Sequence, residues 1–463
     1  MSLIVETSST HEPERRYALD VVLREFLGLP WQHVPADRSD VRITLSGQPG
    51  EIVLPDVLFR VCEDEWLKKP SMPQRPLAHW DTAGLEGPVT VVEARIPVIY
   101  GDAEPRLLRQ DGSIRLPIDI FGSAFFMLSR YEELVIEDRD EHDRFPAWAS
   151  LAYQEGFLER PIVDEYVEIL WVAMQQLWPQ LARKRREPRT FVTCDVDSAL
   201  SFRGKWPRVV RRMGGDLLHR HSPARAWRTL NSAIGTAVGN LAADPDWHGL
   251  QWMMDVNERA GHPVAFYFIP ETTDAKFDNP LPLEDPRSQA LIKQMHERGH
   301  EIGLHPGYQT YQQPETMARS AWSLRQHMAQ AGIDQSAIGG RMHYLRWRTP
   351  ETMRAWEEAG MSYDSTLAYA DHPGFRCGTC HEYPLYDLVA RQPLRLRERP
   401  LIVMECSVIA KRYMGMGYSD DALELMLSYK ETCRRFGGTF TLLWHNSHLG
   451  QDEDKQFYRA LIG

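Results

Sequence analysis

The sequence is poor in several features that mark specialised classes of protein. It has 6 cysteines among 463 residues, too few and too scattered for a disulfide framework. No run of about 18 apolar residues occurs, and the N-terminal stretch MSLIVETSSTHEPERRY lacks a basic start and an apolar core typical of a secretory signal. Lys and Arg number 53 against 64 Asp and Glu, a net charge of −11 that disfavours a general nucleic-acid binder. We therefore expect a cytoplasmic protein with reduced thiols.

The composition is that of an ordinary globular protein, and the length predicts two domains. The best boundary is the cationic stretch LARKRREPRT at residues 181–190, which separates an apolar helical pattern from the β-branched stretch TFVTC. We expect an N-terminal domain over residues 1–185, of α/β or α+β type and without a recognisable chemical motif. A larger domain should occupy residues 186–463.

From residue 190 onward, short apolar runs of strand length alternate with helical patterns. Such alternation implies parallel pairing, and about seven units predict a closed or nearly closed α/β barrel. Caps are expected at Thr349 for one helix and at Ser419 for another, which should end at Gly437. The expected strands are FVTC (191–194), VAFYFI (264–269), EIGL (301–304), AIGG (337–340), MSYD (361–364), LIVMEC (401–406) and FTLLW (440–444).

Polar residues lie at or just beyond the ends of five of these runs. Each alone has an ordinary explanation, because an aspartate after a strand is often a helix cap and a loop histidine is often a surface residue. In a parallel barrel, however, the carboxyl ends of the strands lie on one face, where active sites form. The convergence therefore favours a functional site built from Asp195, Asp197, His305, Arg341, His343, Asp364 and His445.

Two carboxylates, an arginine and several imidazoles match the requirements of metal-assisted hydrolysis. A divalent ion held by imidazole and carboxylate polarises a carbonyl and lowers the pKa of a bound water toward about 7. A second carboxylate can take the proton from that water, and a separate imidazole can protonate the leaving group.

The stretches TCDVD, GHEIGLH, RMHY and LLWH resemble, in this order, the motifs of polysaccharide deacetylases of carbohydrate esterase family 4. The resemblance covers about 190–463 and implies a deformed (β/α)7 barrel. The whole chain also resembles a bacterial subgroup in which an uncharacterised N-terminal domain precedes this barrel, on the stretches FFMLSRYEE, DEHDRFP, PIVDEY, RMHYLR and GFRCGTC. The implied activity removes N-acetyl groups from an oligosaccharide or a cell-surface polysaccharide precursor and releases acetate.

The resemblance also implies a role for each matching residue. Asp195 would be the general base, oriented by Arg341, and His445 would be the general acid. The Tyr344 amide would help to stabilise the oxyanion. Asp197 and His305 would bind the metal, with Zn²⁺ expected first and Co²⁺, Ni²⁺ or Mn²⁺ as alternatives. The substrate pocket would include Asp364, Phe375 and Arg376.

The chain departs from the family pattern at Gln309, where a second metal-binding histidine is expected four residues after His305. The Pro306-Gly307 step also argues against a regular helical turn between the two positions. His343 stands where the family's third motif normally has proline, so it could restore an Asp-His-His set. Alternatively, His343 contacts substrate while water completes the coordination, or no metal binds and the domain is a relic.

Three alternatives to an N-acetyl hydrolase remain open: a saccharide-binding protein on a degenerate barrel, an O-acetyl esterase and a non-sugar amidase.

Residues 201–228 form an insertion with eight Lys or Arg against one Asp. A basic amphipathic segment of this kind could contact an anionic membrane. The plainer alternative is a helix packed on the barrel with its arginines in salt bridges.

Overall fold

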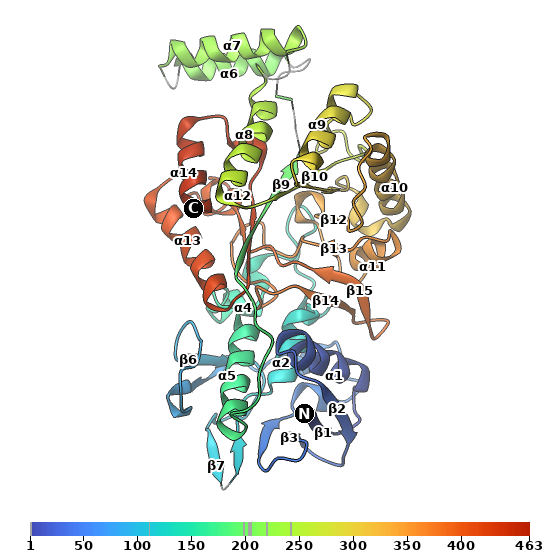
Figure 1. Cartoon of the computed structure of the whole chain (residues 1–463), viewed down its shortest axis with the longest axis vertical. Helices are drawn as coiled ribbons and strands as arrows, with labels where there is room; N and C mark the ends of the chain where they lie inside the picture. The colour runs from blue at the N-terminus through green and yellow to red at the C-terminus, as the bar shows by residue number, and fades with distance from the viewer. Residues whose placement is uncertain (1, 111, 198–199, 202–205, 219–220, 241–242) are drawn as a thin grey trace.

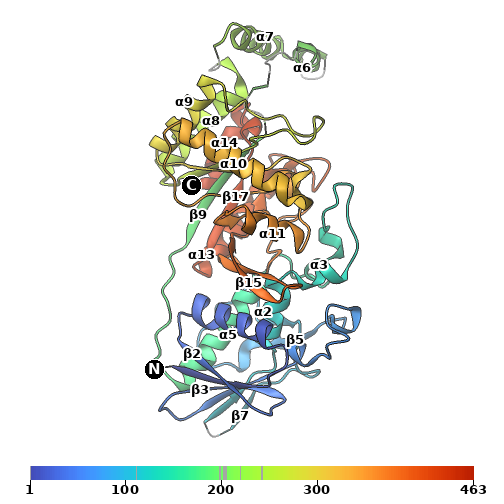
Figure 2. The same ribbon diagram turned by 90° about the vertical axis from the view of Figure 1, so that its right-hand side faces the viewer.

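The computed structural model describes the whole chain except residues 1, 111, 198–199, 202–205, 219–220 and 241–242. The molecule is a mixed α/β protein with an elongated outline (Figure 1). One sheet lies near the N-terminus, a larger one forms the middle of the molecule, and a pair of helices lies at the far end (Figures 1 and 2).

The N-terminal sheet has six strands in the order β2-β1-β3-β4-β8-β7. Its buried side chains alternate along β3, where Val41, Ile43 and Leu45 face the core, as expected for a sheet covered on one side. Three helices, α1 (Glu12–Leu19), α2 (Ile120–Leu128) and α5 (Ile162–Leu177), pack in this part of the molecule. The strands are β1 (Leu3–Thr7), β2 (Trp31–Pro35), β3 (Asp40–Leu45), β4 (Glu51–Pro55), β7 (Leu108–Gln110) and β8 (Ser113–Arg115).

A separate hairpin pairs β5 (Ala78–Asp81) with β6 (Arg95–Val98). The apolar stretch 89–100 could have formed one long strand, but only its second half does. The Val92 amide instead donates to Glu165 Oε1, and the Glu93 carbonyl accepts from Arg160. Glu165, in α5, and Arg160, just before it, thus form hydrogen bonds with backbone groups that a longer strand would use for pairing.

The second sheet has nine strands in the order β14-β15-β13-β12-β11-β10-β9-β17-β16, all parallel except β14. All seven expected runs contribute strands, and these seven are neighbours from β13 to β16. No backbone pairing among the described residues joins β14 to β16, so the expected barrel is not shown to be closed. The strands are β9 (Arg189–Val196), β10 (Val264–Phe268), β11 (Glu301–Leu304), β12 (Gly339–Gly340), β13 (Tyr363–Asp364), β14 (Tyr383–Asp387), β15 (Gln392–Glu398), β16 (Val403–Met404) and β17 (Thr439–Leu443).

Helices connect these strands and pack around them (Figure 2). The Ser419 hydroxyl accepts from the Ala422 amide at the start of α13, and Gly437 has φ +62° beyond its end, which confirms the expected caps. The expected cap at Thr349 is wrong, because α11 begins after Pro350 and the Thr349 hydroxyl accepts from Trp347 Nε1. Within the described part of the chain, no helix combines the length and apolarity needed to cross a bilayer. The main helices here are α8 (Pro245–Ala260), α9 (Pro286–Glu297), α10 (Pro314–Gln330), α11 (Glu351–Glu358), α12 (Glu405–Ile409), α13 (Asp420–Arg435) and α14 (Asp452–Ile462).

Glycines allow β11 and β12 to approach closely beneath the predicted site. A β-carbon on Gly340 would overlap the Leu304 carbonyl, and one on Gly303 would lie 2.7 Å from the Gly339 carbonyl oxygen. The tight pairing lets the Arg341 amide donate to the Leu304 carbonyl at 3.0 Å. The residues that follow the two strands, His305 and Arg341, are therefore held side by side.

Candidate functional site

Most of the polar residues expected at the strand ends do gather in one place. They line a cavity of about 170 Å³ at the carboxyl ends of β9, β11, β12, β16 and β17. The predicted residues in its wall are Asp195, Asp197, His305, His343, Tyr344 and His445, and the wall also includes Arg144, Leu345, Met404, Cys406, Arg412, Tyr413, Leu443, Ser447 and His448.

Asp195 is held by a fully buried arginine. Arg341 Nη1 donates to Asp195 Oδ1 and to Thr193 Oγ1, each at 2.8 Å. Its Nε and Nη2 donate to the carbonyl and hydroxyl of Ser365. Because all three nitrogens are engaged, the guanidinium is fixed, and it fixes the orientation of the Asp195 carboxylate in turn.

Two imidazoles point at the neighbouring carboxylate, Asp197. His305 Nε2 lies 3.1 Å from Asp197 Oδ1, and His343 Nε2 lies 3.6 Å from the same oxygen. The Asp197 side chain is 37% exposed, yet this oxygen is buried, so the carboxylate forms part of the cavity wall with one oxygen turned inward. Asp197, His305 and His343 thus form a compact ligand-type group, which we call the Asp-His-His group.

The hydrogen bonds on the far side of each imidazole determine which nitrogen carries its proton. His305 Nδ1 lies 2.7 Å from the Arg341 carbonyl oxygen, which can only accept. His343 Nδ1 lies 2.8 Å from Asp278 Oδ1, another acceptor. In the neutral form of each ring the proton is therefore on Nδ1, and the Nε2 lone pair faces Asp197.

This arrangement fits a divalent cation. Lone pairs of nitrogen and oxygen facing each other at 3.1 Å repel unless a proton or a cation lies between them. His305 Nε2 and Asp197 Oδ1 are both buried without a hydrogen-bond partner among the described residues. A tetrahedral ion with bonds of about 2.0–2.2 Å places its nitrogen and oxygen ligands roughly 3.3–3.5 Å apart, close to the distances found here. The donor set also matches the imidazole and carboxylate preference of zinc.

Charge in the cavity is strongly coupled. Burial alone would raise the pKa of Asp197, but His343, His305 and His445 together hold it well below its ordinary value. Burial would lower the pKa of His305, yet Asp195 and Asp197 raise it. Each shift reports the same attraction between the imidazoles and the two carboxylates, which a bound cation would replace.

Gln309 lies outside the Asp-His-His group. Its side-chain amide donates to Asp274 Oδ2 at 3.0 Å, and its backbone amide donates to Thr273 Oγ1. The side chain is thus engaged with the loop that precedes α9, and His343 is the group that approaches Asp197 from β12.

His445 faces the cavity with one nitrogen and a buried carboxylate with the other. Its Nε2 lies 3.5 Å from Asp197 Oδ2, and its Nδ1 lies 2.6 Å from Glu405 Oε1. Burial would lower the pKa of His445, but Glu405 above all raises it well above its ordinary value. The contact with Glu405 therefore favours the protonated ring, the form that a general acid requires.

Two supporting residues were missed by sequence reasoning. Asp278 accepts from the amides of Thr273, Asp274 and Tyr308 as well as facing His343, so it fixes that ring. It lies in a loop with no motif to reveal it. Glu405 could have been found, because it follows β16 directly, just as the predicted residues follow their own strands.

Three of the predicted pocket residues do not line the cavity. Asp364 is fully buried, its side chain accepts from Thr366, and burial raises its pKa to about 6. Arg376 donates to both oxygens of Glu133 and to the Ala368 carbonyl. Phe375 packs in the core near Tyr429. Asp364 is therefore placed behind Arg341, and the other two lie where the N-terminal part meets the larger sheet.

A loop of the N-terminal part reaches the cavity instead. Arg144 is held by Asp140 and donates to the Tyr344 carbonyl at 2.9 Å. His142 Nδ1 lies 2.9 Å from the Tyr308 hydroxyl, and its carbonyl accepts from Arg346. Tyr344 itself has φ +64°, a left-handed conformation unusual for a bulky residue. The N-terminal loop thus supports a strained segment of the cavity wall.

Comparisons with known proteins give one family match and several likenesses to solved structures. Residues 3–179, less than half of the chain, match a family of unknown function, DUF7033. No curated protein matches the sequence. The chain is similar to a solved structure from Mycobacterium smegmatis described as a polysaccharide deacetylase, with 17% identity, a TM-score of 0.39 and coverage of 60% of this chain and 84% of the other.

A second structure described as a polysaccharide deacetylase, from Pseudomonas aeruginosa PAO1, is 16% identical with a TM-score of 0.33, covering 48% of this chain and 69% of the other. Puue allantoinase is 13% identical with a TM-score of 0.36, covering 62% and 85%. At these scores the likeness supports no inference about the activity of this chain.

Proposed function

We propose that the protein is a metal-dependent hydrolase that removes N-acetyl groups from a saccharide and releases acetate. The observation that supports this most strongly is the cavity itself, where Asp195, the Asp-His-His group and His445 face one another. The order of the four sequence motifs that resemble polysaccharide deacetylases supports the choice of an amide bond in a sugar. The larger part of the chain would supply this chemistry.

Each residue has a distinct task in this proposal. Asp197, His305 and His343 hold the divalent ion, Zn²⁺ in the first instance, which supplies polarisation of the acyl carbonyl and acidification of water. Asp195, oriented by Arg341, accepts a proton from the attacking water. His445, oriented by Glu405, donates a proton to the departing amine nitrogen. The amide of Tyr344 stabilises negative charge on the acyl oxygen.

The test is acetate release from N-acetylated chito-oligosaccharides after the protein is stripped with a chelator and reconstituted separately with Zn²⁺, Co²⁺, Ni²⁺ and Mn²⁺. Acetate release that depends on the added metal and on Asp195 supports the proposal. A protein that binds none of these ions and turns over nothing contradicts it.

The same assay distinguishes the alternatives. Faster release from O-acetylated than from N-acetylated sugars would identify an esterase. Sugar affinity that survives chelation, Asp195→Ala and Asp197→Ala, without turnover, would identify a saccharide-binding protein. The position of His343 beside Asp197 favours the enzyme, because the imidazole stands in for the one that Gln309 cannot provide.

We further propose two domains, residues 1–185 and 186–463. The two larger sheets support this division, since one uses strands from residues 3–115 and the other uses strands from residue 189 onward. In this proposal the first domain has a supporting role at the cavity, through the loop that carries His142 and Arg144.

The segment 201–228 is proposed to contact anionic membrane. Helices α6 (Trp206–Leu218) and α7 (Pro223–Ala237) pack on each other at the end of the molecule opposite the N-terminal sheet (Figure 1). Trp206, Leu218 and Trp227 are exposed on these helices, and so are Arg211 and Arg228. Residues 202–205 and 219–220 of the segment lie outside the described part. Sedimentation with phosphatidylserine vesicles, but not with phosphatidylcholine vesicles, is the expected result.

A further inference from the structure

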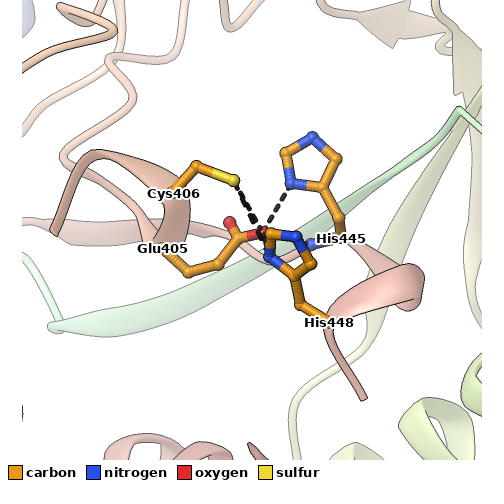
Figure 3. Close-up of side chains that lie close together, drawn as sticks. All are labelled: Glu405, Cys406, His445 and His448. Atoms are coloured by element: carbon orange, nitrogen blue, oxygen red, sulfur yellow. Dashed lines mark hydrogen bonds and ion pairs between the residues drawn. The ribbon is translucent and has the colours of Figure 1, made fainter. Parts of the chain in front are cut away.

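A second group of ligand-type side chains lies on the far side of His445 from Asp197. Figure 3 shows Glu405, Cys406, His445 and His448 converging on the Glu405 carboxylate. Glu405 and Cys406 begin α12, while His445 and His448 follow β17. One potential ligand atom from each residue lies within 4.8 Å of all the others. These four residues are within reach of one common centre.

The hydrogen bonding of Glu405 is uneven. Its Oε1 lies 2.6 Å from His445 Nδ1, 2.9 Å from His448 Nδ1 and 3.0 Å from the His445 amide nitrogen. The Cys406 sulfur lies 3.7 Å from the same oxygen. Oε2, by contrast, is buried without a hydrogen-bond partner among the described residues. A carboxylate oxygen has two lone pairs, so the donors crowd one oxygen and leave the other unsatisfied.

Two of the three distances among Glu405, Cys406 and His448 fit a thiolate-binding cation, and the third, 2.9 Å between His448 Nδ1 and Glu405 Oε1, would have to lengthen by roughly 0.5 Å. Cys406 Sγ lies 3.7 Å from both His448 Nδ1 and Glu405 Oε1. A tetrahedral zinc ion places its sulfur and nitrogen ligands roughly 3.6 Å apart, from bond lengths of about 2.3 and 2.1 Å. Thiolate, imidazole and carboxylate are the ligands that zinc takes, and the thiolate disfavours magnesium and calcium.

We propose that Glu405, Cys406 and His448 form a second binding site for a divalent cation of the zinc type, separate from the Asp-His-His group. Binding requires Cys406 Sγ to lose its proton to solvent and His448 Nδ1 to be free of one, by loss to solvent or by a shift to Nε2, so that both atoms can bind the ion. The cavity provides the route of entry, because Cys406 and His448 form part of its wall. An ion bound through both carboxylate oxygens of Glu405 would satisfy Oε2 and would compete with His445 for Oε1, so the two sites would be coupled through that ring.

A similar set of ligand-type side chains elsewhere in the molecule has no unsatisfied carboxylate oxygen and provides a control. Asp164, Cys380 and His381 also lie close together. There, however, both oxygens of Asp164 accept hydrogen bonds, one from the Thr379 hydroxyl and the other from the Cys380 amide and thiol. That set is satisfied by protein groups alone, and we assign no ion to it.

The test uses Co²⁺, because a cobalt–thiolate bond gives an intense charge-transfer absorption that imidazole and carboxylate ligands do not give. Chelator-treated protein is titrated with Co²⁺ and followed by ultraviolet and visible absorption. The wild type is expected to show the thiolate band and to bind two ions. Cys406→Ser should abolish the band and bind one ion, while Cys380→Ser and Cys62→Ser should keep the band.

His448→Gln retains the thiol and should weaken the thiolate-bound ion by at least about tenfold, as loss of a ligand requires. Asp197→Asn should retain the band, so failure of the hydrolase proposal does not affect this result. A band that persists in Cys406→Ser, a wild type without a band, or unchanged Co²⁺ affinity in His448→Gln would each overturn the second site. Circular dichroism of every variant confirms that it is folded.

Discussion

Two buried charged clusters in this molecule have opposite hydrogen-bonding states. The interface cluster, made of Arg130, Glu132, Glu133 and Arg376, joins the N-terminal part to the larger sheet. Every one of its carboxylate oxygens accepts a hydrogen bond: Arg130 donates to Glu132 and Glu133, Arg376 donates to both oxygens of Glu133, and the Leu151 amide donates to the remaining oxygen of Glu132. In the Asp-His-His group, by contrast, Asp197 Oδ1 and His305 Nε2 have no hydrogen-bond partner among the residues that the structure describes.

The difference shows how a structural charge cluster can be told from a ligand site. Burying charge costs several kcal/mol per ion unless partners compensate it. At the interface the protein supplies all the partners, so the cluster is complete. In the cavity Asp197 Oδ1 and His305 Nε2 face one another, and a bound cation would accept the lone pairs of both. The residue types alone would not distinguish the interface cluster from the Asp-His-His group, since both combine carboxylates with side chains that can carry positive charge.

The largest effect is expected for the proposed general base. Asp195→Asn keeps the size of the side chain but cannot accept the proton from water, so kcat for acetate release should fall by about 10²–10⁴-fold. Metal content should stay at the wild-type value. Asp364→Asn is the matched control, because that carboxyl lies at the end of another strand of the same sheet, β13, and outside the cavity. Activity of Asp195→Asn within tenfold of the wild type would rule out its role.

At the interface cluster, the expected effect is on stability. Glu133→Gln leaves Arg130 and Arg376 short of a charge partner and should lower the free energy of unfolding by about 3–5 kcal/mol at pH 7. Chemical denaturation measures this, and metal affinity of the folded variant should not change. A loss below about 1 kcal/mol, the size expected of an exposed pair, would contradict the comparison.

The difference in free energy of unfolding between the wild type and Glu133→Gln should depend on pH. Burial alone would raise the pKa of Glu133, but Arg376 and Arg130 lower it from 4.5 to about 2. A lowered pKa in the folded state stabilises the protein above the unfolded-state value, and the contribution is lost as the pH falls. The difference in free energy of unfolding should therefore be constant above about pH 5 and should decrease as the pH falls from about 4.5 to about 2.

A smaller effect is expected behind the Asp-His-His group. Asp278→Asn removes the carboxylate that orients His343 and should weaken metal binding by about 10–100-fold. Calorimetric titration of Zn²⁺ measures this directly. Unchanged affinity would mean that His343 does not depend on Asp278 for its orientation.

The smallest effect is expected at Gln309. Because its side chain is bonded to Asp274, Gln309→Ala should change Zn²⁺ affinity by no more than roughly threefold, the range of an ordinary peripheral substitution. His343→Ala should abolish tight binding under the same conditions. Equal metal retention in the two variants would contradict the replacement of the missing histidine by His343.

Much of the larger sheet could be predicted from sequence, because each strand is a short apolar run flanked by a helical pattern. The strand-end rule predicts that Asp195, Asp197, His305, Arg341 and His445 lie close together, and the structure places four of them in the cavity wall with Arg341 bonded to Asp195 behind it. It failed for Asp364, whose strand ends under Arg341 and which is therefore covered. The expected closure of the barrel is not shown, since the β14–β15 pair extends the sheet beyond β13 and no pairing among the described residues joins β14 to β16.

Contacts between distant segments were also beyond sequence reasoning. Arg376 seemed suited to a sugar pocket, but its position is set by Glu133, which lies far away in the chain. The same holds for Arg144, which reaches the cavity from the N-terminal part. Asp278 lies in an irregular loop, and only its folded position beside His343 reveals its role.

The most direct test of the central claim is anomalous diffraction at the zinc edge from crystals of the zinc-loaded protein. The account predicts a peak about 2.0–2.2 Å from Asp197 Oδ1, His305 Nε2 and His343 Nε2, the distances typical of zinc bound by oxygen and nitrogen. The absence of a peak between these three atoms, in crystals of protein that is shown to contain zinc, would contradict the account.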